Sequence, residues 1–262
     1  MGTAAPSPRI QHLRQTLAEI DPSLGPRLAG EERLLALAAP IDAVLGGGLA
    51  CGALHELAAT APAHLAAASG FALALAALAG ESGGQTLWIA TDFATAEGGG
   101  PYGSGLDLLG LASTRLLLLR VPRAIDALWA MEEALRCRAL ACVIVELSGE
   151  GEVADLTATR RLSLAAREGT GFGLLLRHHA VALPSAAATR WDVAAALSEP
   201  DAFGGLGRPR FDLFLRRNRR GSSGRWIVTW DPHERAFCAA LSVAVAETSL
   251  HRSDRAPLAR TG

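Results

Sequence analysis

The sequence contains no lysine, so all 25 of its Lys+Arg positions are arginine. A P-loop, the phosphate-binding loop of many ATPases, needs a lysine for the β- and γ-phosphates and a Ser or Thr for magnesium. It also needs glycines, because backbone N–H groups surround the phosphates there. The sequence therefore excludes a working site of this kind, and we expect neither ATPase activity nor a cofactor.

Cysteine is scarce as well, with four residues at Cys51, Cys137, Cys142 and Cys238. None of them has the C-x-x-C spacing of a zinc site, and their positions do not suggest a disulfide framework. Since free cysteine is among the most buried residue types, we expect all four to be buried apolar packing residues. We expect no metal site.

An excess of charge of one sign is also missing, because the formal net charge is −1 and only 19% of the residues are charged. Any attraction to nucleic acid must therefore come from a local cluster. Half of the residues are hydrophobic, which is a globular composition, and 262 residues fit one domain with terminal additions. No signal-peptide core is seen, and the apolar run Leu65–Ala79 is short and alanine-rich for a membrane span, so we expect a cytoplasmic protein.

Short apolar runs alternate with helical patterns from residue 53 onward. The runs that we predict to be strands are Ala53–Ala58, Thr86–Thr91, Arg115–Val121, Ala141–Leu147 and Gly171–Arg177. A helix over 125–137 is expected to place one set of apolar residues on a common side: Ile125, Leu128, Trp129, Met131 and Leu135. A second helix over 156–167 follows Asp155 as its N-cap. Such an order predicts a mainly parallel sheet covered by helices on both faces.

The pattern changes after Pro184. Strand-like pieces follow at 189–196, 210–216 and 225–230, and the turn-rich connection 217–224 predicts that the last two form an antiparallel hairpin. An amphipathic helix is expected to begin at Pro8. We therefore divide the chain into an N-terminal helical appendage (1–40), a core domain (41–246) and a disordered polar tail (247–262).

Two consecutive segments, Ile41–Leu49 and Gly52–Leu57, resemble the entry to the ATP site of RecA-family recombinases. In that family an aspartate and a Leu-Gly-Gly turn lead into the first core strand, as Asp42 and Leu45-Gly46-Gly47 do here. The later strands follow in the same order, and the basic hairpin 211–230 resembles the paired strands that close the recombinase core. The resemblance covers roughly residues 40–231 and implies a RecA-like α/β core.

The positions that match the P-loop have lost its chemistry. Alanine and histidine stand at glycine positions (Ala59 and His64), leucine stands at the lysine (Leu65), and alanine at the Ser/Thr (Ala66). The carboxylates that would accompany this degenerate nucleotide site are Glu56, Asp92 near the catalytic glutamate position, and Glu146 at the Walker B position. Two alternatives stay open for them: strand-end residues that face solvent or a helix terminus, or remnants of a weak nucleotide site.

Four further segments resemble the ImuA family, RecA-like accessory proteins of bacterial damage-induced mutagenesis: Leu128–Arg136, Leu156–Leu162, Pro184–Trp191 and Gly205–Arg210. The resemblance implies a non-catalytic adaptor in error-prone translesion DNA synthesis within the SOS response. It also implies the partners: an ImuB-type Y-family polymerase-like protein and an error-prone C-family DNA polymerase, with RecA and single-stranded DNA as further candidates. Two other functions remain open, a weak nucleotide-binding switch and a SulA-like cell-division inhibitor.

A cluster of seven arginines lies within eighteen residues, opposed in that window by Asp212 alone: Arg208, Arg210, Arg216, Arg217, Arg219, Arg220 and Arg225. We expect the turn to display Arg219 and Arg220 outward. The cluster is a solvated sheet edge protected by charge, a site for DNA phosphates, or a docking site for an acidic protein. Arg160, Arg161 and Arg167 form a second, weaker basic strip.

The remaining signals favour structural roles. The run 98–103 fits the pattern G-x-G-x-x-G, but it lies beyond the strand end and contains a proline, so we interpret it as an irregular loop. His178 and His179 follow a strand and are expected to face solvent or to be hydrogen-bonded. Trp226 and Trp230 are predicted core residues. No nucleophile motif supports a hydrolase.

Overall fold

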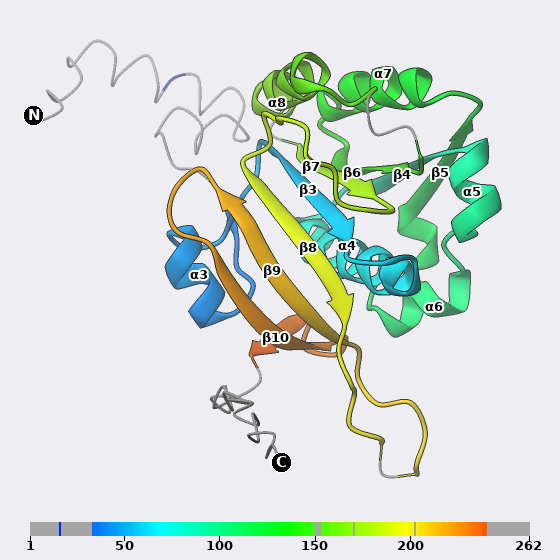
Figure 1. Ribbon diagram of the computed structural model, residues 1–262, viewed down its shortest axis with the longest axis vertical. Coiled ribbons are helices and arrows are strands. Elements are labelled where there is room, and N and C mark those ends of the chain that lie inside the picture. Colours follow the sequence, from blue (N-terminus) through cyan, green and yellow to red (C-terminus); the bar gives the residue numbers. More distant parts are fainter. Residues whose placement is uncertain (1–15, 17–32, 150–152, 170, 202, 240–262) are drawn as a thin grey trace, which may run out of the picture.

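The computed structural model describes Thr16 and residues 33–149, 153–169, 171–201 and 203–239 (Figure 1). Except for Thr16, the helix that is expected to begin at Pro8 lies outside these residues, and so does the polar tail from residue 247.

A nine-stranded sheet forms the centre of the described chain, in the order β11-β10-β9-β8-β3-β7-β6-β4-β5. The strands that run parallel to one another are β3 (Ala53–Ala59), β4 (Gln85–Thr91), β5 (Leu116–Val121), β6 (Leu140–Leu147), β7 (Phe172–Arg177) and β8 (Thr189–Ala195). The antiparallel strands are β9 (Arg210–Asn218), β10 (Gly224–Asp231) and β11 (Ala236–Ala239). The expected α/β fold with a mainly parallel sheet and an antiparallel basic hairpin is thus confirmed, and it is consistent with a RecA-like core.

Helices cover the two faces of this sheet unequally. On one face α4 (Leu65–Ala79) and α3 (Ala39–Leu45) pack on a core that reaches from β4 to β11. On the other face α7 (Ala124–Leu135) and α8 (Leu156–Gly169) pack on β3, β7, β6 and β4, with Val121 of β5 and Ala187 before β8 at the margins of this core. Figure 1 shows β8, β9 and β10 side by side, with no helix lying across the side that is turned to the viewer.

Short elements complete the described chain. They are β1 (Leu34–Leu35), β2 (Leu49–Ala50), α5 (Asp92–Gly98), α6 (Gly103–Leu108) and 3-10 turns at Pro62–His64, Gly80–Ser82 and Ser113–Arg115. The run 98–103, expected to be a loop, contains the last residue of α5 and the first of α6. The stretch Pro62–Ala79 is long and apolar enough to cross a membrane by length and composition. It packs on the sheet, with Phe71, Leu75 and their neighbours fully buried.

Helix α7 was predicted correctly, and three of the five apolar residues expected on its common side are buried. Leu128, Met131 and Leu135 face the sheet, together with small alanines. Ile125 is exposed, and the Trp129 side chain is 65% exposed. The prediction was wrong for Ile125 and Trp129, because alanines, which carry little hydrophobic signal, occupy the remaining sheet-facing positions.

The cysteine expectation holds for one residue of four. Cys142 is buried in β6, where burial raises the pKa of its thiol, whereas Cys137 and Cys238 are exposed and Cys51 is intermediate. Cys137 follows the end of α7, and Cys238 lies in β11, a strand that the sequence pattern did not reveal. All four are free thiols.

The two edges of the sheet differ in length and polarity. The short strand β11 forms one edge, and β5 forms the other, pairing with β4 alone. Three consecutive residues of β5, Leu117, Leu118 and Leu119, are exposed, with Leu118 at 59%. Successive strand residues point to opposite faces, so both sides of this edge present leucine.

Candidate functional site

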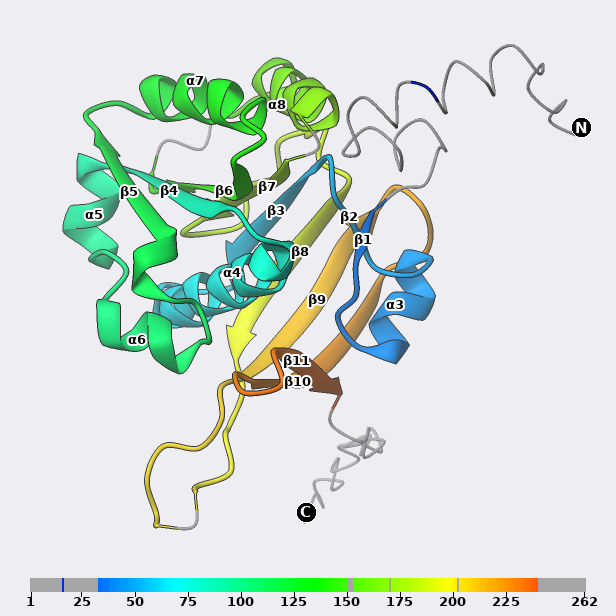
Figure 2. The same ribbon diagram turned by 180° about the vertical axis from the view of Figure 1, so that it is seen from behind.

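A cavity of about 550 Å³ lies where the P-loop would hold phosphates. It opens beside the carboxyl ends of the parallel strands, the position at which open α/β sheets bind ligands. After β3 the chain passes through the 3-10 turn Pro62–His64 into α4, which forms one wall with Leu65 and Ala66. Glu97–Tyr102 and α6 form the opposite wall, and Figure 2 shows α6 beside α4.

The charged groups of this cavity, in the described part of the chain, are the carboxylates of Glu97 and Glu146, and Ser69 and Tyr102 add uncharged polar side chains. Glu146 is only 3% exposed, so it does not face solvent as one sequence interpretation had it. Its Oε2 accepts a hydrogen bond from Trp88 Nε1 at 3.1 Å, and its Oε1 lies 2.8 Å from His178 Nε2. The other ring nitrogen of His178 lies 3.7 Å from Glu97 Oε2, which also accepts a hydrogen bond from Ser148. His178 is thus hydrogen-bonded, as expected, and buried.

No cation lines the cavity in the described part of the chain. Leu65 and Ala66 present hydrocarbon where an ATPase presents an ammonium group and a hydroxyl, and Glu97 and Glu146 add negative charge. Phosphate binding requires N–H donors and positive charge, so these walls do not fit the triphosphate of a nucleotide. The chemistry of the cavity suits apolar or positively charged groups.

The other predicted members of the degenerate site do not line this cavity. Ala59 ends β3 within the apolar core, and His64 Nδ1 accepts a hydrogen bond from the Ala195 N–H at 3.2 Å. Asp92 is the first residue of α5, is exposed, and pairs with Arg120 at 2.9 Å. It therefore corresponds to the helix-terminus alternative.

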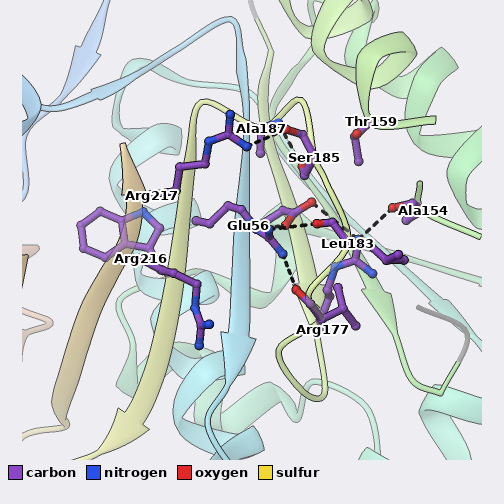
Figure 3. Close-up of polar contacts among 12 residues, drawn as sticks. Glu56, Ala154, Thr159, Arg177, Leu183, Ser185, Ala187, Arg216 and Arg217 are labelled. Carbon is purple, nitrogen blue, oxygen red and sulfur yellow. Dashed lines mark hydrogen bonds and ion pairs between the residues drawn. The ribbon is translucent and has the colours of Figure 1, made fainter. Parts of the chain in front are cut away.

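Glu56 lies in a buried ion cluster on the opposite face of the sheet (Figure 3). Arg190 Nε is 2.8 Å from one of its carboxylate oxygens, and Arg177 Nη2 is 3.6 Å from the other. Burial lowers the pKa of the Arg177 guanidinium, and the charge of Glu56 opposes this shift. Arg190 also donates to the Val181 and Leu183 carbonyls. Glu56 thus fixes the segment before β8 and is not part of the cavity.

Four of the seven clustered arginines are neutralised by carboxylates that lie far from them in the sequence or across the hairpin. These ion pairs are Arg208–Asp231 (2.6 Å), Arg210–Glu199 (3.8 Å), Arg216–Asp192 and Arg225–Asp212. The hydrogen bond to Asp192 raises the pKa of Arg216. Three of these acids lie outside the window of eighteen residues: Asp192 in β8, Glu199 between β8 and β9, and Asp231 at the end of β10.

Two of the remaining arginines are turned toward the backbone before β8. Arg217 Nη1 donates to the Ser185 carbonyl at 3.3 Å. Arg219 donates from Nε to the Ala187 carbonyl at 3.0 Å and from Nη2 to the Ser185 carbonyl at 3.2 Å. Arg219 is exposed, as expected, and these two hydrogen bonds fix the position of its guanidinium. Arg220 is exposed, and its backbone N–H is held by Asn218 Oδ1.

The sequence did not reveal a groove of about 420 Å³ between α7 and α8. Trp129, Ile125 and Leu162 contribute to its apolar lining. Two ion pairs flank it, Arg123–Asp126 at 2.7 Å and Arg161–Glu132 at 2.6 Å. The apolar stripe of α7 that indicated a core helix is in part the lining of this groove.

Comparison with known proteins gives the family. No protein-family model matches the chain. The chain is similar to Protein ImuA of Caulobacter vibrioides strain NA1000 / CB15N, with 31% identity over 197 residues that cover 70% of this chain and 77% of the relative. Protein ImuA of Caulobacter vibrioides strain ATCC 19089 / CIP 103742 / CB 15 gives the same identity and coverage. The chain therefore belongs to the ImuA family.

Proposed function

We propose that the chain is a cytoplasmic RecA-like adaptor without ATPase chemistry that acts in error-prone translesion DNA synthesis. Family membership places it at the coarser level of damage-induced mutagenesis. We propose in addition that the chain holds other proteins together and catalyses no reaction itself.

The observation that carries this proposal is the composition of the cavity beside β3 and β6. A RecA-like ATPase holds phosphates at this place through N–H donors and cations, but here Leu65 and Ala66 form a wall and Glu146 is buried at the base. With hydrocarbon at the positions of the lysine and the hydroxyl, nothing in this lining balances the negative charge of Glu97 and Glu146, so the site repels the phosphates that its fold would otherwise accept. Selection for nucleotide turnover would not leave such a lining.

An adaptor also needs surfaces for proteins, and the groove between α7 and α8 supports this requirement. A tryptophan that is 65% exposed beside an apolar groove is typical of protein interfaces, in which aromatic anchors fill pockets. The family resemblance supplies the occupant that we propose, the ImuB-type polymerase-like protein. A C-family polymerase and the RecA filament are the further proposed members of the assembly.

Two measurements test the proposal together. In isothermal titration calorimetry we expect ATP with magnesium to bind no tighter than about 1 mM, and we expect no DNA-stimulated hydrolysis above a protein-free blank. Affinity purification from DNA-damaged cells should recover the polymerase-like partners. Saturable micromolar ATP binding would favour the nucleotide switch, and recovery of a tubulin-like division protein instead would favour the SulA-like function.

A further inference from the structure

The two basic strips of the sequence meet at one end of the sheet, around the extended segment Ser185–Ala187. On one side, α8 holds the middle residue of this segment: Ser163 Oγ donates to the Ala186 carbonyl at 3.1 Å, and the Ala186 N–H donates to Thr159 Oγ1 at 3.0 Å. On the other side lies the β9–β10 hairpin. Its Arg217 and Arg219 donate hydrogen bonds to the Ser185 carbonyl, and Arg219 also donates to the Ala187 carbonyl. The segment therefore lies between α8 and the hairpin, as Figure 1 shows.

Helix α8 contributes Arg160 and Arg167 to this end. They lie three residues before and four residues after Ser163, and residues at these spacings share one side of a helix. Both are exposed, and neither forms an ion pair with any described carboxylate. Arg161 differs, because it points to the α7 side and is neutralised by Glu132.

The hairpin contributes Arg217 and Arg219. Their partners are backbone carbonyls, which orient a guanidinium but do not cancel its charge. Arginine has five N–H donors, and the bonds of Arg219 to the segment use two of them. Held cations with unused donors suit phosphate oxygens, with which arginine forms charge-assisted and often bidentate hydrogen bonds.

We propose that Arg160, Arg167, Arg217 and Arg219, here called the arginine rim, bind the phosphate backbone of single-stranded DNA. This inference rests on the proposed function for the choice of DNA, and it goes beyond that function by assigning the residues. A flexible single strand can fit its phosphates to guanidiniums whose positions the protein has fixed. The rim offers charges and no set of side chains for base edges, so binding is independent of sequence.

The observations favour nucleic acid over an acidic protein. Protein interfaces have a core depleted of charge and enriched in aromatic residues, whereas DNA interfaces are more polar and strongly positive. The exposed Trp129 lies in the groove on the α7 side of α8, at Arg161, and does not belong to the rim. The acidic groups Glu97 and Glu146 lie beside the carboxyl ends of the parallel strands, whereas the rim is at the amino end of β8, where the Arg219 N–H bonds to the Ala188 carbonyl.

The test is fluorescence anisotropy with a labelled oligothymidylate and the full chain, over about 50 to 300 mM salt. Two variants remove the rim in halves, Arg160→Gln/Arg167→Gln and Arg217→Gln/Arg219→Gln. The matched control is Arg120→Gln/Arg123→Gln, which changes the net charge equally at two exposed, ion-paired sites in and after the edge strand β5. Each rim variant should weaken binding about ten-fold or more and reduce the slope of log affinity against log salt by about 1.4, since a single strand gives about 0.7 per phosphate contact. The control should bind like the parent.

The Arg217→Gln/Arg219→Gln variant loses hydrogen bonds to Ser185 and Ala187 and can disturb folding. The Arg160→Gln/Arg167→Gln variant keeps the test decisive, because these two side chains form no ion pair with a described carboxylate. Parent protein that fails to bind at the lowest salt, or an α8 variant that binds like the parent, overturns the proposal. Equal affinity for a duplex competitor overturns the choice of a single strand. Unchanged DNA binding with loss of the polymerase-like partner shows a docking site for an acidic protein. Loss of DNA binding with the partner still captured leaves the adaptor function standing, so the two failures are separable.

Discussion

At the scale of single residues, the buried cluster around Glu56 decides more of the stability than any exposed ion pair described above. Glu56 lies between Arg177 and Arg190, and all three side chains have little access to water. Removing one partner of a buried pair leaves an uncompensated charge in a medium of low dielectric constant, and its cost exceeds the original attraction. The carboxylate therefore acts as a structural counter-ion for the segment that leads to the arginine rim.

We expect Glu56→Ala to lower the free energy of unfolding by about 3 to 5 kcal/mol, because two guanidiniums would then share a buried site without a counter-charge. Urea unfolding followed by circular dichroism measures the change. Asp92→Ala is the matched control, since it breaks an exposed ion pair with Arg120 and should change stability by no more than about 1 kcal/mol. Equal losses in the two variants would contradict the structural role assigned to Glu56.

The residue scale also shows what could not be predicted from the sequence. Asp42, Leu65, Ala66 and Glu146 were recognised because a family pattern gives each of them a position. The partners of Glu56 and of the hairpin arginines depend on which strands become neighbours. Asp192 is 24 residues from Arg216 in the sequence, and Asp231 is 23 residues from Arg208, yet the sheet brings each pair into contact. Charges counted along the chain do not show which residues pair across strands. The four arginines that form ion pairs were therefore grouped with those whose side chains donate to backbone carbonyls.

At the scale of elements, local sequence patterns predicted which helices and strands form better than they predicted which side of a helix faces the sheet. The parallel strands were placed within one residue of their observed ends, because continuous apolar runs are typical of strands buried on both faces. The rotation of α7 was missed, since an alanine-rich face packs as well as a leucine-rich one when the backbones lie close. Strand β11 was missed because it is only four residues long and partly exposed.

The rotation of α7 leads to a paired prediction. Met131→Ala should cost about 2 to 5 kcal/mol, because it removes a fully buried side chain from the core. Trp129→Ala should change stability by less than about 1 kcal/mol, since the indole is mostly exposed, but it should reduce capture of the polymerase-like partner. Thermal unfolding and a pull-down measure the two effects. A large loss of stability in Trp129→Ala would show that the groove is closed in solution.

At the scale of the whole molecule, charge is separated along the direction of the parallel strands. Carboxylates line the cavity beside their carboxyl ends, and the arginine rim surrounds the segment at the amino end of β8. The net charge of −1 conceals this arrangement, because it sums 25 arginines and 26 carboxylates over the whole chain and carries no information on where they lie. Under the proposed function, ends of opposite charge orient a DNA strand and a protein partner on separate surfaces.

The leucine-rich edge strand β5 has a consequence for the behaviour of the isolated chain. Natural sheet proteins guard an edge with lysine, proline or a bulge, and β5 has none of these, with Arg120 as its single charged residue. Copies at high concentration should therefore associate through this edge and come out of solution, the more so in a chain with little net charge. We expect Leu118→Arg to raise the solubility limit several-fold without a change in melting temperature, because a charge there blocks strand addition at an exposed position. Static light scattering across a concentration series measures the effect, and unchanged aggregation would show that the molecule shields this edge by other means.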